Sequence, residues 1–177
     1  MLQLLNQYFR NRTVWILLFL STAILFLIAL YFQYMMSLEP CVLCIYQRCA
    51  LLGIMLSALI AIVAPNSVIF RFTALVLWIY SGFRGFDWAH QQAILHTDPY
   101  TFHACPLTTE FPHWFPLDNW LPAVFESRGA CSENTWKLLT LDVSQWMMLV
   151  FALYSFIGIL VFISQLFRLP QRKTWRY

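Results

Sequence analysis

Long apolar runs separated by short polar stretches dominate the hydrophobic pattern of this chain. Four runs stand out, at about Val14–Phe32, Ile45–Ala64, Val68–Phe86 and Val143–Ile163. Each is close to the ~20 residues that a helix needs to cross ~30 Å of hydrocarbon. Because 60% of the residues are hydrophobic and only 11% are charged, the pattern predicts an all-α membrane protein. We expect a single domain over residues 1–177, a bundle of four membrane-spanning helices.

Basic residues indicate how the four spans are oriented. Seven of the eleven lie on the side of the membrane where a four-span topology places both termini: Arg10, Arg12, Arg71, Arg168, Arg172, Lys173 and Arg176. By the positive-inside rule this side is cytoplasmic, so both termini are expected there. The polar segments at about 33–44 and 87–142 then face outward. The net charge of +3 therefore reflects topology and gives no reason to expect nucleic-acid binding.

Two spans have a competing interpretation. Arg71 and Arg84 flank the uncharged core of the third span, but both side chains can snorkel to opposite interfaces. The first span follows Arg10 and Arg12, as the apolar run of a cleaved signal would. Its nineteen residues exceed a usual signal segment, and no small-x-small cleavage site follows it. We therefore predict that both runs are retained helices.

Four of the five cysteines fall in the outward-facing parts of the chain. Cys41 and Cys44 form a C-x-x-C before the second span, and Cys105 and Cys131 lie in the long polar segment. Disulfides are stable outside the cytosol. A bridge across two intervening residues constrains very little chain, so redox chemistry explains the C-x-x-C better than stability does. A Cys105–Cys131 bridge would stabilise its loop by ~3 kcal/mol, and taken alone it is better interpreted as structural. Beside a redox-active pair, it also becomes a candidate for thiol–disulfide exchange.

An arginine lies one helical turn beyond the C-x-x-C. An arginine such as Arg48 costs free energy inside a span, which favours a functional role. Snorkelling to lipid headgroups is the alternative. A cation beside a C-x-x-C at the membrane surface would bind the carbonyl oxygen of a lipid-soluble quinone and stabilise developing negative charge. Arg84 is a weaker candidate of the same kind.

The remaining cysteine and the histidines give no metal pattern. Cys49 is expected to be a buried packing residue. Because only one close pair of cysteines exists, a zinc site is not expected. The histidines have spacings that match no common ligand pattern, and we expect solvated loop residues: His90, His96, His103 and His113.

The outer segment also contains an amphipathic stretch. From Pro116 to Phe125 the apolar residues recur at helical spacing, as in a helix that lies on a membrane surface. Pro122 should make this helix short or kinked. The alternative is a loop whose aromatic side chains pack on the bundle.

Several of these motifs together resemble the DsbB family. They are P-C-V-L-C-I-Y-Q-R at 40–48, Y-S-G-F-R-G at 80–85, P-L-D-N-W at 116–120, and the outer cysteines Cys105 and Cys131. The resemblance covers nearly the whole chain. Members of this family are disulfide oxidoreductases of the bacterial inner membrane, four-helix bundles that reoxidise the periplasmic thiol oxidase DsbA and pass electrons to a quinone.

The resemblance implies an enzyme, a protein-dithiol:quinone oxidoreductase, with a DsbA-type partner and ubiquinone or menaquinone as its cofactor. Its redox cysteines would lie on the periplasmic side of the inner membrane. Cys105 would form a mixed disulfide with the partner, and the released Cys131 would exchange with Cys41. Cys44 would then meet the quinone, with Arg48 beside the quinone ring.

The sequence departs from the family pattern at one position. Where members carry a histidine after the third span, Gln92 aligns here, with His90 two residues earlier. We assign neither residue a role. Two alternatives stay open: a DsbB-like paralogue dedicated to another periplasmic partner, and a non-enzymatic four-helix scaffold whose disulfides only hold loops in place.

Overall fold

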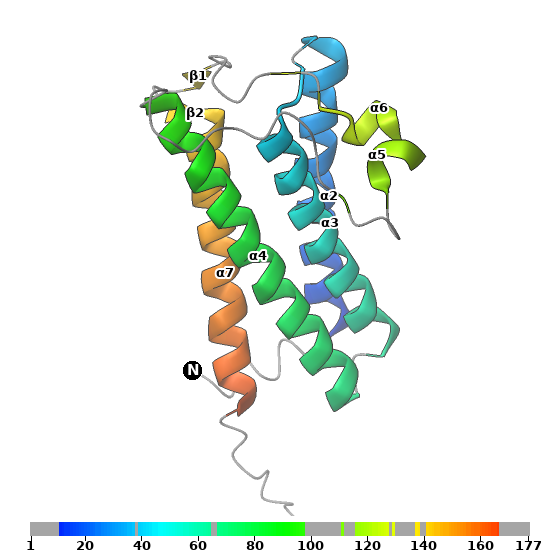
Figure 1. Cartoon of the computed structure of the whole chain (residues 1–177). Coiled ribbons are helices and arrows are strands. Elements are labelled where there is room, and N and C mark those ends of the chain that lie inside the picture. Colours follow the sequence, from blue (N-terminus) through cyan, green and yellow to red (C-terminus); the bar gives the residue numbers. More distant parts are fainter. Residues whose placement is uncertain are drawn as a thin grey trace, which may run out of the picture.

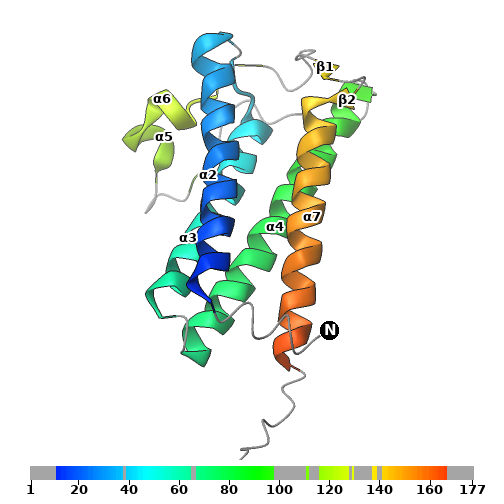
Figure 2. The same ribbon diagram turned by 180° about the vertical axis from the view of Figure 1, so that it is seen from behind.

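Four long helices make up most of the described part of the protein. The computed structural model describes residues 11–37, 39–64, 67–97, 111, 116–127, 129, 137–138 and 141–166. The long helices are α2 (Arg12–Met35), α3 (Val42–Val63), α4 (Val68–Thr97) and α7 (Val143–Leu166). All four are long and apolar enough to cross a membrane, and they run alongside one another as a bundle (Figures 1 and 2). The predicted all-α, four-span fold is confirmed, and the cytoplasmic position of the termini stays a prediction.

Smaller elements gather at one end of this bundle, which we call the cysteine end because Cys41 and Cys44 lie there. Helices α5 (Leu117–Trp120) and α6 (Pro122–Phe125) lie beside α2 and α3, as Figures 1 and 2 show. Strands β1 (Lys137–Leu138) and β2 (Leu141–Asp142) pair antiparallel just before α7.

Helix α4 is longer than the apolar run that predicted it. We expected the third span to end at about residue 86 and a polar outer segment to begin at 87, but the helix continues to Thr97. The helix is therefore longer than the apolar run, because its extra turns pack on protein, and the position of the membrane boundary stays a prediction. Ala89, Gln92 and Leu95 are buried, whereas His90, on the opposite face, and Gln91 are exposed. Helices α2 and α3 also reach further into the predicted 33–44 segment than expected.

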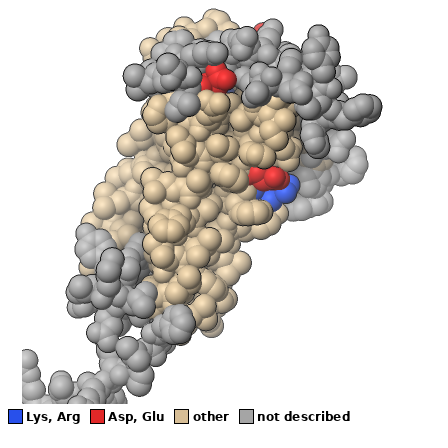
Figure 3. All heavy atoms as spheres, turned by 90° about the vertical axis from the view of Figure 1, so that its left-hand side faces the viewer, with Lys and Arg blue, Asp and Glu red and all other residues tan. Residues whose placement is uncertain are grey.

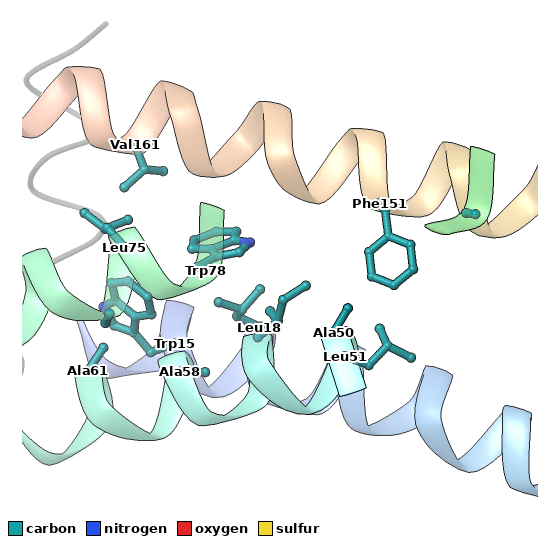
Figure 4. Close-up of a cluster of buried hydrophobic side chains, with 13 residues drawn as sticks. Trp15, Leu18, Ala50, Leu51, Ala58, Ala61, Leu75, Trp78, Phe151 and Val161 are labelled. Atoms are coloured by element: carbon teal, nitrogen blue, oxygen red, sulfur yellow. The ribbon is translucent and has the colours of Figure 1, made fainter. Parts of the chain in front are cut away.

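The core lies between the four helices and contains side chains from each. Figure 4 shows Trp15 of α2, Ala58 of α3, Trp78 of α4 and Phe151 of α7 pointing into the same interior. The rings of Trp15 and Trp78 meet edge to face, with centroids 6.0 Å apart. Small residues let the backbones approach, as is usual between membrane helices. At Gly85, for example, an added Cβ would collide with the ring of Phe151.

The outside of the bundle is apolar, as lipid requires. Large hydrophobic side chains on all four long helices are exposed, and among the residues coloured in Figure 3 the charged side chains lie in the upper part of a broad uncharged face. Inside, the buried hydroxyls of Thr22, Ser57 and Ser164 each donate to a backbone carbonyl three or four residues earlier. These bonds satisfy polar groups that no water can reach in a bilayer.

Arg71 differs from its prediction. The sequence allowed its side chain to snorkel to the interface at the beginning of the third span. Arg71 lies within the first turn of α4 and is only 3% exposed, so its side chain is buried in protein.

The contact at Gly85 gives a test of the packing. Gly85→Leu should destabilise the protein by ~2 kcal/mol, because the new side chain has no space beside Phe151. The midpoint of thermal unfolding in detergent measures this loss. Val76→Leu is the matched control, because Val76 is 47% exposed on the same helix and should leave the midpoint unchanged. Equal midpoints for both variants would contradict the close α4–α7 packing.

Candidate redox site

The C-x-x-C forms a disulfide at the beginning of α3. Cys41 and Cys44 are bonded, with their Cα atoms 5.1 Å apart, within the usual range for a disulfide. Cys41 is the N-cap of the helix: its backbone is extended and its Sγ accepts a hydrogen bond from the Cys44 backbone N–H at 3.2 Å. The sulfurs therefore lie at the positive end of the helix dipole, which stabilises a thiolate.

A cavity of about 150 Å³ opens beside this disulfide. It lies between α2, α3, α4 and α7 and is mostly apolar. The apolar lining includes Leu25, Ile28, Phe32, Leu51 and Met147, and the polar lining includes Gln33, Cys44, Gln47, Arg48 and Gln92. Cys41 is not among the lining residues; it is 3% exposed and packs with Leu43 and Leu95. The two sulfurs of one disulfide thus have different surroundings.

Arg48 is buried, with a side chain that links three parts of the chain. Its Nη1 donates to Gln33 Oε1 at 2.6 Å and to the carbonyl of Val124 at 2.8 Å, and its Nη2 donates to the carbonyl of Ala29 at 3.2 Å. Because Arg48 is only 5% exposed, the snorkelling alternative is wrong. The guanidinium joins α3 to α2 and to α6, and it forms part of the cavity wall.

Gln92 lies directly against the disulfide. Its Nε2 is 3.3 Å from Cys44 Sγ and 3.5 Å from Cys41 Sγ, and its Oε1 accepts a hydrogen bond of 2.7 Å from Gln47 Nε2. Both glutamines are buried. Our sequence reasoning gave Gln92 no role and missed Gln47, although a polar residue one turn inside an apolar span was a usable signal.

Arg84 does not share this site. It is not among the residues that line the cavity. It is paired with Asp87 at 3.4 Å, and its guanidinium lies over the ring of Trp88, 4.8 Å from the centroid. The suggestion that Arg84 has the same role as Arg48 finds no support in this placement.

The segment after α5 is held against the cysteine end by hydrogen bonds to and from its backbone. Gln33 and Tyr34, near the end of α2, both donate to the carbonyl of Ala123, at 2.9 and 2.7 Å. Further along, the backbone N–H of Gly129 donates to the carbonyl of Pro40 at 3.2 Å. A Cβ at Gly129 would collide with the carbonyl oxygen of Glu39, so only glycine fits here without a shift.

The predicted amphipathic helix is present as two short pieces, because Pro122 begins a new helix, α6, after α5. Phe125 is buried and packs edge to face on Phe111, whose ring packs in turn on Tyr46 of α3, as in the alternative of aromatics packed on the bundle. Trp120 and Leu121 are exposed. Their contact with a membrane surface stays a prediction.

The other sequence predictions concern cysteine and histidine. Cys49 is free and partly buried, so it is less enclosed than expected. His90 is exposed as predicted but lies on α4, stacked on Phe86, because the helix continues past residue 86. No group of three or more metal-binding side chains occurs within the described part of the chain. Cys105 and Cys131 lie outside the described residues.

Comparison with known proteins decides the family. The sequence profile described as disulfide bond formation protein DsbB matches residues 11–161. The chain belongs to the DsbB family. It is 44% identical over 173 residues to disulfide bond formation protein B of Yersinia pestis (strain Pestoides F), covering 98% of this chain and 97% of the relative. The proteins of the same name from Pectobacterium atrosepticum and Salmonella typhimurium are 44% and 42% identical, each covering 97% of both chains. The chain is therefore a multi-pass membrane protein of disulfide bond formation.

Proposed function

We propose that this protein is a protein-dithiol:quinone oxidoreductase of the bacterial inner membrane. It reoxidises a periplasmic DsbA-type thiol oxidase and passes two electrons through two cysteine pairs to a membrane quinone, with these cysteines on the periplasmic side. The observation that carries the proposal is the position of the Cys41–Cys44 disulfide. One of its sulfurs belongs to a residue that lines an apolar cavity within the membrane-spanning bundle, beside a buried arginine.

The cavity has the chemistry that a quinone head group needs. A cavity of about 150 Å³ holds one six-membered ring, and its lining is mostly aliphatic and aromatic. Arg48 lies in the wall and is a donor for a carbonyl oxygen that gains negative charge. When bound, a quinone supplies the capacity to accept two electrons. The chain's own residues would hold the ring beside Cys44 and exclude water from it.

The cysteines would act in sequence. The thiolate of the reduced partner attacks Cys105, a mixed disulfide forms, and Cys131 is released as a thiolate. That thiolate attacks Sγ of Cys41, the Cys41–Cys44 bond breaks, and Cys44 leaves as a thiolate at the cavity. The partner's second thiolate would then attack the partner's own sulfur in the mixed disulfide, which forms the partner's disulfide and releases Cys105 as a thiolate. Cys105 would attack Cys131, the Cys131–Cys41 bond would break, and the pair Cys41 and Cys44 would be left reduced by the two electrons from the partner.

Gly129 supports the second of these exchanges. Its hydrogen bond to Pro40 places the chain beside the residue that precedes Cys41. Cys131 follows Gly129 by two residues, a reach of at most ~7 Å for an extended chain. The backbone contact would therefore keep Cys131 within range of Cys41.

The relay from partner to quinone can be tested with the purified protein in detergent. Wild type, supplied with a reduced DsbA-type partner and a short-chain ubiquinone, should reduce the quinone. Cys44→Ala and Cys105→Ala should each abolish turnover, since each removes one step of the relay, whereas Cys49→Ala should retain it. If folded wild-type protein reduced no quinone, the proposal would be wrong, and the disulfides would be interpreted as structural staples.

Arg48 should matter for quinone affinity. Arg48→Lys keeps the charge but cannot make three hydrogen bonds in the arginine geometry. The KM for the quinone should rise about tenfold, the scale of one lost hydrogen bond to a charged group. Steady-state kinetics measure this, with Arg84→Lys as the control because Arg84 does not line the cavity. Equal KM values for the two variants would argue against Arg48 as a quinone ligand.

Gly129 should matter only for exchange between the two cysteine pairs. Gly129→Ala would push the chain away from Glu39, so turnover with the protein partner should fall about 10- to 100-fold. Turnover with dithiothreitol, a small dithiol that reduces Cys41–Cys44 without Cys131, should be unchanged. Ser127→Ala, two residues earlier, is the control. A similar loss with both reductants would indicate a general disturbance of the site.

A further inference from the structure

The disulfide has a buried hydrogen-bond donor aimed at it from another helix. Gln92 of α4 is 5% exposed. Its amide nitrogen lies 3.3 Å from Cys44 Sγ and 3.5 Å from Cys41 Sγ. A disulfide sulfur is a weak acceptor, so these contacts offset only a small part of the free energy that burial of the amide costs. The same nitrogen would bind a thiolate far more strongly, because a hydrogen bond to an ionised group is roughly twice as strong as a neutral one.

The orientation of this amide follows from its second partner. Gln47 Nε2 lies 2.7 Å from Gln92 Oε1, which makes that oxygen the acceptor and leaves the nitrogen toward the sulfurs. If both amides were turned over, the oxygen of Gln92 would face the sulfur lone pairs, which repel it. The arrangement with the donor facing the sulfurs is therefore the one in which every contact is attractive.

We infer that Gln92 stabilises the Cys44 thiolate that is released when the Cys41–Cys44 disulfide opens, and that Gln47 positions Gln92 for this task. The inference rests on the proposed function, in which that thiolate carries the electrons. A thiolate attacks Cys41 Sγ, a new S–S bond forms there, and the Cys41–Cys44 bond breaks. Its electron pair stays on Cys44, and no proton is required. Gln92 touches the reacting sulfur and is a catalytic residue, whereas Gln47 acts through Gln92.

Helix α3 supplies a second, separate stabilisation of the same thiolate. Cys44 lies in its first turn, at the positive end of the dipole. The Gln92 amide approaches from α4, so the thiolate would lie between a helix terminus and a side-chain donor. Removing the donor should leave the contribution of the helix in place, so the thiolate should lose only part of its stabilisation.

The reduction potential of the pair tests this inference without quinone or partner protein. The full-length protein would carry Cys49→Ala, Cys105→Ala and Cys131→Ala, so that every remaining thiol belongs to the pair. After equilibration with mixtures of reduced and oxidised dithiothreitol at pH 7, alkylation and mass spectrometry give the reduced fraction. Gln92→Met keeps the size of the side chain and removes the donor. The equilibrium constant should shift about tenfold toward the disulfide, which corresponds to ~30 mV.

Two further variants separate donor loss from general damage. Gln91→Met, the exposed neighbour that bonds Asp87, should leave the equilibrium unchanged. Gln47→Met should shift it in the same direction as Gln92→Met, but less. The double variant should match Gln92→Met alone, because Gln47 acts only through Gln92.

The outcomes are distinct. A shift below twofold in folded Gln92→Met would overturn the inference, and additive effects in the double variant would overturn the positioning role of Gln47. If Gln92→Met does not fold, the unchanged equilibrium of Gln47→Met would overturn it instead. A tenfold shift in a protein whose wild type reduces no quinone would refute the proposed function and leave the thiolate contact standing.

Discussion

Polar groups that are buried at the cysteine end of the apolar bundle need hydrogen-bond partners within the protein, and this constraint determines how that end is built. Arg48 meets it with three hydrogen bonds, to Gln33, Ala29 and Val124. Those bonds join the second span to the first and to the loop helix α6. Arg48 therefore connects the elements that form the cavity wall, and in the proposed function the same guanidinium would also bind the quinone.

The two cysteines of the disulfide share the contact with Gln92 but otherwise have different surroundings. Cys41 is enclosed by apolar residues and follows Pro40, whose carbonyl binds Gly129. Cys44 lines the cavity. In the proposed relay, attack on Cys41 would leave the electron pair of the broken bond on Cys44, the sulfur at the cavity. The helix N-terminus and the Gln92 amide both favour negative charge at that sulfur.

The sequence predicted the features that depend on composition and on short motifs. Four apolar runs became four helices, and the Cys41–Cys44 spacing became a disulfide, because span length and C-x-x-C geometry are local properties. The failures involved contacts between distant segments. Nothing local shows that Arg71 is buried, that Gln92 reaches the sulfurs from 48 positions away, or that Gly129 rests on Pro40. The roles of Cys105 and Cys131 come from family resemblance, since they lie outside the described residues.

The length of α4 explains how a residue beyond the apolar run came to lie at the disulfide. A helix of 30 residues is ~45 Å long, well over the ~30 Å of hydrocarbon. Its apolar part packs in the core around Trp78, and its polar extension rises beside the first turn of α3. Ala89 and Leu95 bury one face of that extension, which fixes the rotation of the helix and points Gln92 at the sulfurs. Hydropathy ends the span at residue 86 because it measures transfer into lipid, whereas the turns that carry Gln92 are stabilised by packing on protein.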